Sequence, residues 1–163
     1  PSSDCGCQGD CCFEVLISRV RVMEDQGGAL SGGSGVGEAG DGGNFSDDME
    51  LVFNVLADGQ GEVYPSLTSF ISISKRHRWV AVNKVVNRLP VPCGGSRTVP
   101  LTAEVMEVET TVAGGRPEVG SESGTLVLSC GCPTVPAQIL VRLAAGGQAD
   151  QAEVLVEVTA RQV

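Results

Sequence analysis

The sequence predicts an all-β protein, folded as an antiparallel β-sandwich of about eight strands with Greek-key or jelly-roll connections. The chain has 24 valines against four Phe, one Tyr and one Trp, and β-branched side chains favour strands. Short apolar runs alternate with polar residues and are separated by turn residues. Every stretch long enough for a helix carries β-branched clusters or the wrong period. A chain of 163 residues fits one domain.

The first predicted strand covers residues 13–23. Val15 and Ile17 share one phase of the apolar alternation, whereas the next two valines take the other phase. A change of phase within one strand indicates an extra residue. We therefore expect a β-bulge near Ser18-Arg19.

The later predicted strands have the same alternating character, and a tight turn is expected at Asp58-Gly59. One of them, 99–112, is expected to bend or bulge because Val108 breaks its parity. The later strands cover residues 49–55, 67–74, 79–86, 99–112, 125–129, 139–144 and 153–159.

Two segments fall outside this pattern. We expect a cysteine-rich N-terminal arm at 1–12 and a single sandwich domain at 13–163, interrupted by a glycine-rich loop at 26–48. Ordering such a loop costs on the order of 1 kcal/mol per residue. Packing against neighbouring subunits would offset that cost, and a bound cation is the alternative.

The chain contains seven cysteines, and an odd number cannot be exhausted by internal pairing. At least one thiol therefore stays free, binds a metal or reaches another chain. We expect the arm to supply inter-subunit contacts through its four cysteines, which are Cys5, Cys7, Cys11 and Cys12.

A second hypothesis places a soft metal such as zinc, or disulfides, at the first two arm cysteines and the C-x-C pair near the C-terminus. The paired C-x2-C spacing of common zinc sites is missing, and free thiols are the third alternative. The residues concerned are Cys5, Cys7, Cys130 and Cys132.

Acidic residues at the end of the glycine-rich segment are the candidates for a hard cation, since calcium takes six to eight oxygen ligands. They are Asp41, Asp47, Asp48 and Glu50, with Asn44 between them. We expect a calcium site if the segment that carries Glu104, Glu107 and Glu109 comes close to them. The alternative is an acidic surface that keeps the protein soluble.

With such a calcium site, the chain would resemble C2-type domains in its strand patterning and acidic loops. The resemblance covers no specific motif. It implies a calcium- or ligand-binding module, with the basic segment from Lys75 to Trp79 facing an anionic surface.

The net charge of -9 argues against nucleic acid as a partner, because phosphate binding needs clustered basic residues. No apolar run approaches the roughly 20 residues of a membrane span. The N-terminus has neither the basic start nor the apolar centre of a signal peptide. We therefore expect synthesis in the cytosol, followed by incorporation into a virion or an extracellular fibre.

These observations predict a non-enzymatic structural subunit of a larger assembly, such as a capsid decoration, tail or fibre protein of a virion. Its partners would be copies of itself or other particle proteins. The alternative is the calcium- or ligand-binding module. A hydrolase ranks last, because the one histidine, His77, has no orienting carboxylate nearby in sequence.

Overall fold

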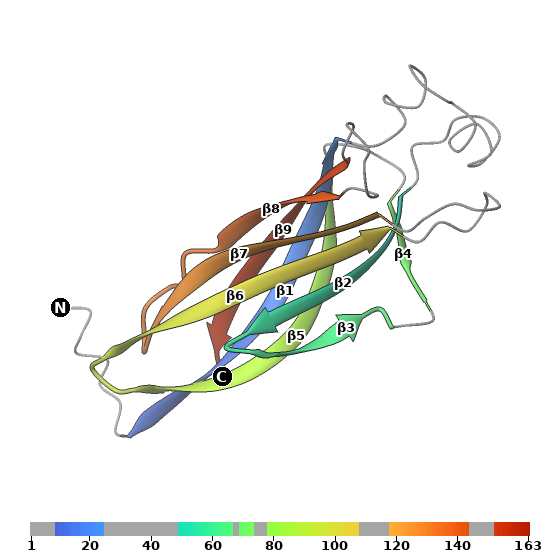
Figure 1. The fold of residues 1–163 in the computed structure, drawn as a ribbon. Coiled ribbons are helices and arrows are strands. Elements are labelled where there is room, and N and C mark those ends of the chain that lie inside the picture. Colours follow the sequence, from blue (N-terminus) through green and yellow to red (C-terminus); the bar gives the residue numbers. More distant parts are fainter. Residues whose placement is uncertain (1–8, 25–48, 67–68, 74–77, 108–117, 144–151) are drawn as a thin grey trace, which may run out of the picture.

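The computed structural model describes residues 9–24, 49–66, 69–73, 78–107, 118–143 and 152–163. Within these ranges the chain forms nine strands and no helix. The strands make two antiparallel sheets packed face to face, as Figure 1 shows. The prediction of an all-β sandwich is confirmed, with nine strands in place of about eight.

Sheet A has the strand order β5-β1-β9-β8. Its strands are β1 (Asp10–Glu24), β5 (Trp79–Pro92), β8 (Ala137–Leu143) and β9 (Ala152–Gln162). Sheet B has the order β3-β2-β6-β7, and β4 also pairs with β2. Its strands are β2 (Met49–Ala57), β3 (Gln60–Tyr64), β4 (Ile71–Ile73), β6 (Ser96–Glu107) and β7 (Glu118–Ser129).

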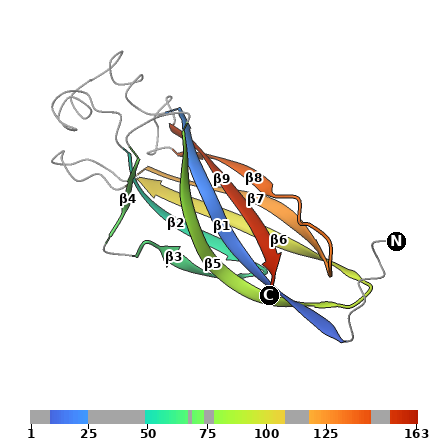
Figure 2. The same ribbon diagram turned by 180° about the vertical axis from the view of Figure 1, so that it is seen from behind.

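Hairpins join β2 to β3, β6 to β7 and β8 to β9, whereas the chain changes sheet between β1 and β2, β4 and β5, β5 and β6, and β7 and β8. Consequently β1 lies between two strands that are distant in sequence, β5 and β9 (Figure 2). We call the end where β1, β6 and β8 finish the loop pole. The opposite end, where β1 begins and β5, β7 and β9 finish, is the cysteine pole (Figure 1).

The expected bulge in β1 is confirmed. The register of β1 shifts between Ile17 and Arg19 against both β5 and β9. The extra residue restores the inward phase, so that Val15, Ile17 and Val20 are all 0 % exposed. All the apolar residues of this strand that were predicted on two phases therefore reach one core.

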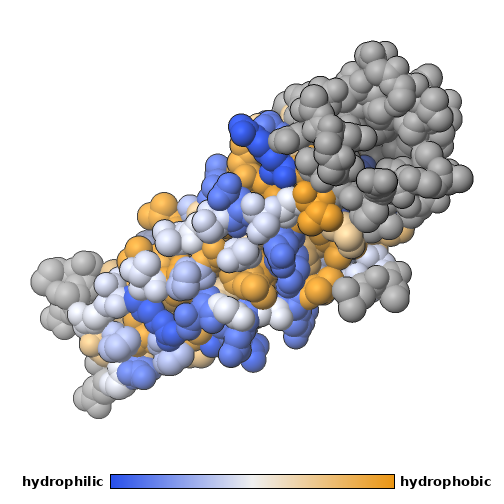
Figure 3. All heavy atoms as spheres, viewed as in Figure 1, coloured by the Kyte–Doolittle hydropathy of each residue, from blue (hydrophilic) through white to orange (hydrophobic). Residues whose placement is uncertain are grey.

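Aliphatic side chains from both sheets fill the core, together with Phe13 from β1 and Phe53 from β2, which are 1 % and 0 % exposed. Outside the core, polar and apolar residues are interspersed on the outer face of sheet B (Figure 3). The packed interior is what holds the two outer faces at fixed positions.

The turn at Asp58-Gly59 is also confirmed, and it joins β2 to β3. Its residues have φ values of 55° and 80°, as the two-residue hairpin turns with positive φ require. We did not predict β3, a short edge strand in which no residue is buried. The bend expected in 99–112 falls beyond Glu107, outside the described residues, and β6 is regular up to that point.

The edges of β7 and β8 approach each other closely at one side of the sandwich. A Cβ atom on Gly120 of β7 would collide with the backbone carbonyl of Arg142 in β8. Only a residue without a side chain therefore permits this approach. Ile139 packs in the same way beside Gly124, where a Cβ would lie 3.0 Å from its side chain.

Gly120→Ala should lower the free energy of unfolding by about 1–3 kcal/mol, the usual cost of overpacking against an atom that cannot move freely. The matched control is Gly95→Ala, because the nearest atom to that Cβ is 3.6 Å away. Urea unfolding of both variants measures the difference. Equal stability of the two variants would contradict the close approach of β7 and β8.

Candidate functional site

Five cysteines lie at the cysteine pole of the described structure. Three of them are disulfide-bonded, and two of these three bond to each other. Cys11 of β1 bonds to Cys130, which directly follows β7, and the bond spans 119 residues of sequence. It links sheet A to sheet B, and both residues are buried, at 6 % and 0 % exposure. A cross-link closing so long a loop stabilises a fold by about 2–5 kcal/mol.

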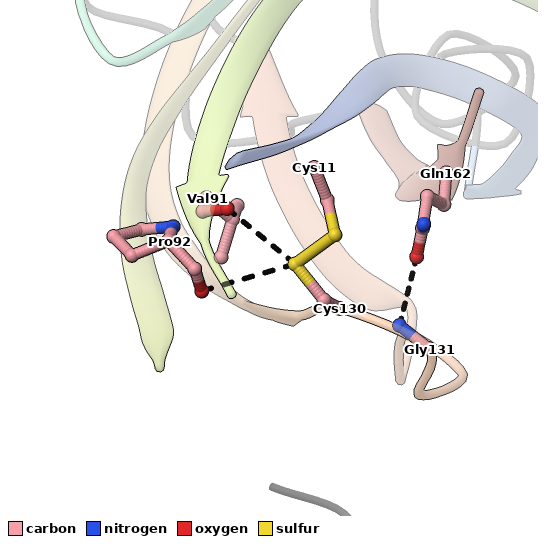
Figure 4. Close-up of a disulfide and its surroundings, with 6 residues drawn as sticks. All are labelled: Cys11, Val91, Pro92, Cys130, Gly131 and Gln162. Carbon is pink, nitrogen blue, oxygen red and sulfur yellow. Dashed lines mark hydrogen bonds between the residues drawn. A yellow bond between two sulfur atoms is a disulfide. The ribbon is translucent and has the colours of Figure 1, made fainter. Parts of the chain in front are cut away.

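Contacts around the disulfide hold the ends of the surrounding strands in place (Figure 4). The Cys130 sulfur lies 3.4 Å from the carbonyl oxygen of Val91 at the end of β5. The backbone N–H of Gly131 donates to Oε1 of Gln162 at 2.8 Å. The disulfide therefore sits where β1, β5, β7 and β9 converge.

The other described cysteines differ in bonding and in exposure to solvent. Cys93 is disulfide-bonded, and its backbone N–H donates to the carbonyl of Gly9 at 3.1 Å. Cys132 is a half-buried thiol, whereas Cys12 is an exposed one. Strand alternation explains the contrast between neighbours, because Cys11 points into the core and Cys12 points outward from sheet A.

These positions correct part of the expectation for the arm. Cys11 and Cys12 belong to β1, and the prediction that Cys11 bonds another subunit is wrong because it bonds within the chain. The disulfide alternative for Cys130 is confirmed. Cys5 and Cys7 lie outside the described residues. No group of three or more metal-ligating side chains occurs in the part of the chain that the structure describes.

The outer face of sheet A carries a cross-strand ion cluster. Glu14 of β1 stands directly opposite Arg88 of β5 and Arg161 of β9. The Arg88 Nη2 and Arg161 Nε atoms lie 2.6 Å and 3.0 Å from its carboxylate oxygens. Hydrogen bonds from Arg88 first, and then from Arg161, hold the pKa of the Glu14 carboxyl below its ordinary value.

A second cluster forms at the bulge of β1. Arg19 Nε donates to Oε2 of Glu157 at 2.7 Å, and Ser18 Oγ donates to the backbone carbonyl of Glu157 at 3.1 Å. The Arg19 guanidinium also stacks 4.0 Å from the ring centre of Trp79, and the Arg21 guanidinium lies 5.6 Å from it. Ser18 Oγ also lies 3.2 Å from Oε1 of Glu157, so the bulge turns two consecutive side chains toward the same carboxylate.

The arginines cover their carboxylate partners on this face. The side chains of Arg88, Arg161 and Arg19 are 68 %, 58 % and 43 % exposed. Those of Glu14 and Glu157 are only 9 % and 8 % exposed. Solvent therefore meets guanidinium groups on the outside of sheet A, although the chain as a whole has a net charge of -9. We call this surface the arginine face.

Sequence reasoning missed the arginine face, because its members are scattered between residues 14 and 161. The predicted basic cluster contributes Trp79, whereas Lys75, Arg76 and His77 lie outside the described residues. The signal that could have found the face is the outward phase of β1, where Glu14 and Arg21 alternate with buried residues. Pairing of β1 with β9 is still needed to bring in Arg161.

At the loop pole the predicted calcium ligands are described only in part. Asp41, Asp47 and Asp48 lie outside the described residues. Glu107 stands opposite Leu51, the neighbour of Glu50, so β6 does come beside this end of β2. Glu107 is 6 % exposed and shares the inward phase of β6, whereas Glu50 shares the outward phase of β2. Calcium binding here stays a prediction.

A polar groove of about 420 Å³ runs between the edges of β7 and β8. Its lining consists of Ser121, Glu122, Ser123, Gln138, Ile139, Leu140 and Arg142. None of these residues is a histidine, the usual base that activates a nucleophile, or a cysteine, a usual nucleophile. In the described ranges no helix is long and apolar enough to cross a membrane.

Acid should destabilise the protein through Glu14. Because its pKa is lowered in the folded state from 4.5, the carboxylate stabilises the fold fully above that value, and the contribution is lost as the pH falls through the folded pKa. Glu14→Gln should lower the melting temperature at neutral pH and flatten its decline in acid. Exposed Glu122→Gln is the control, and an identical pH profile for both variants would contradict the assignment.

Calcium should raise the melting temperature if the acidic residues near Glu50 form a site, because a ligand that binds only the folded state stabilises it. Differential scanning fluorimetry with millimolar calcium measures the shift, and magnesium serves as the control ion. Absence of a shift removes the calcium hypothesis.

Comparison with known proteins assigns no family. No protein-family model matches the chain, and no curated protein matches its sequence.

Proposed function

We propose that the protein is a non-enzymatic structural subunit of a larger assembly and that its cysteine pole contacts a neighbouring subunit covalently. The observation that carries this proposal is the exposed Cys12 thiol beside the buried Cys11–Cys130 disulfide. Cys11, the neighbour of Cys12 in sequence, is already used in the internal bond. The outward Cys12 thiol can therefore bond to a thiol of a second copy. An odd number of cysteines supports the same conclusion.

Rigid surroundings favour such a contact. Cys12 lies in a strand, and its carbonyl accepts a hydrogen bond from the N–H of Val163 at 2.9 Å. Val163 is 63 % exposed and Val135, in the connection before β8, is 81 % exposed. The exposed residue Val163 next to this fixed thiol provides part of a surface for a self-contact. Across a two-fold axis, the Cys12 thiols of two copies would face each other.

The internal disulfide supports an oxidising final location. Such bonds form and persist outside the reducing cytosol, and the same conditions would close a bond between copies. An extracellular fibre and a released particle both meet this condition. The identity of the assembly as a virion component stays a prediction.

Oxidised protein should run as a covalent dimer on a non-reducing gel, and reductant should return it to a monomer. Cys12→Ser should abolish the dimer, because it removes the outward thiol and leaves the internal disulfide in place. Cys132→Ser is the matched control and should still dimerise. Mass measurement by light scattering confirms the state in solution.

Two outcomes would overturn the proposal. If wild-type protein forms no covalent dimer under oxidising conditions, no covalent subunit contact passes through the cysteine pole. If Cys12→Ser still forms the covalent dimer, another cysteine makes the contact and the assigned role of Cys12 fails.

A further inference from the structure

The two sheets differ strongly in charge. Sheet A carries six basic and five acidic residues within its strands, whereas sheet B carries one basic and six acidic residues. The basic residues of sheet A are Arg19, Arg21, Lys84, Arg88, Arg142 and Arg161. The acidic residues of sheet B are Glu50, Glu62, Glu104, Glu107, Glu118 and Glu122. By the formal charges within their strands, sheet A is therefore more basic than sheet B.

Both outer faces carry a row close to the loop pole that is apolar apart from Arg21 on sheet A. On sheet A, register places Trp79, Arg21, Leu155 and Leu140 in one row across the four strands. On sheet B, register places Val52, Met106 and Val119 in the corresponding row across three strands. Leu140 is 37 % exposed and Val119 is 50 % exposed. Water therefore reaches apolar side chains in both rows.

The next outward row toward the cysteine pole is polar on both faces, with opposite charge in reach of solvent. On sheet A it contains Arg19, whose Nε binds Glu157 and whose two Nη groups make no hydrogen bond to described residues. On sheet B it contains exposed Glu104, which accepts a hydrogen bond from Nδ2 of Asn54 at 2.8 Å. Rows on one strand face are about 7 Å apart on both sheets.

We propose that copies of this chain stack in parallel, with the arginine face of one copy on the outer face of sheet B of the next. This inference rests on the proposed assembly function and names the partner as a second copy. Apolar row meets apolar row, and the two guanidiniums beside Trp79, those of Arg19 and Arg21, meet Glu104. Because the two contacting faces differ, the contact repeats and forms an open stack.

Arg21 is the free cation in this contact. It forms no ion pair with any described residue, and the one described side chain that its guanidinium stacks on is Trp79. Its Nε is buried without a hydrogen-bond partner among the described residues. A carboxylate delivered by a neighbouring copy would give the rest of the guanidinium a charged partner.

The test uses the full chain with Cys12→Ser, so that only non-covalent association is measured. Sedimentation velocity in low salt should show stacks that grow with protein concentration and dissociate in high salt. Arg21→Glu and Glu104→Arg should each weaken association at least tenfold. The double variant R21E/E104R should regain it, because the charge pair between copies is reversed but intact.

The matched control is R21E/E122R, since Glu122 is an exposed acid of β7 outside the contacting rows. It should remain monomeric, and circular dichroism should show all variants folded. Any one of three results would overturn the stack. The C12S parent could stay monomeric in low salt, or both single variants could associate as strongly as the parent. R21E/E122R could also associate as strongly as R21E/E104R. None of these results affects the covalent dimer through Cys12, so failure of the two proposals can be told apart.

Discussion

The register of β1 between β5 and β9 is the constraint on which the rest of the structure depends. Strand alternation sends Cys11 into the core and Cys12 outward, and the bulge after Ile17 resets the alternation once. Without that extra residue, Val20 and the rest of the strand would present their apolar side chains to solvent. The same bulge brings Arg19 to Glu157. Core, disulfide and arginine face are therefore consequences of one pairing.

The fold was predictable because its signals are local. A period of two, a change of phase near Ser18 and a glycine turn at Gly59 can each be recognised within a few neighbouring residues, and all three are confirmed. The sites were less predictable because they depend on distant pairs. Glu14 meets Arg161 only after β1 has paired with the last strand, and Cys11 could have chosen any of six partners. Edge strand β3 buries no residue and left no periodic signal.

Burial of two carboxylates beneath arginines needs a physical reason in an acidic protein. A carboxylate that is 9 % exposed, such as Glu14, would be costly without the two guanidiniums that bind it. The same arrangement fixes the arginines, because Arg88 and Arg161 are held by a shared acid. The outward guanidinium groups are thus ordered before any partner arrives, which lowers the entropy cost of binding.

The proposed stack limits where the proposed disulfide between Cys12 thiols of two copies can form. The outward rows of both faces have the same spacing, counted from the loop pole. In an aligned stack, Cys12 of one copy would therefore lie against the row of Thr98 and Val127 on sheet B of the next copy, close to the cysteine pole. Within a stack, the neighbouring copy would then cover Cys12. At one end of the stack, the terminal copy has an uncovered arginine face, and its Cys12 stays exposed. Covalent bonding would therefore join two stacks at those ends, with reversed direction. Oxidation would set how stacks connect, while charge and apolar packing would set how they grow.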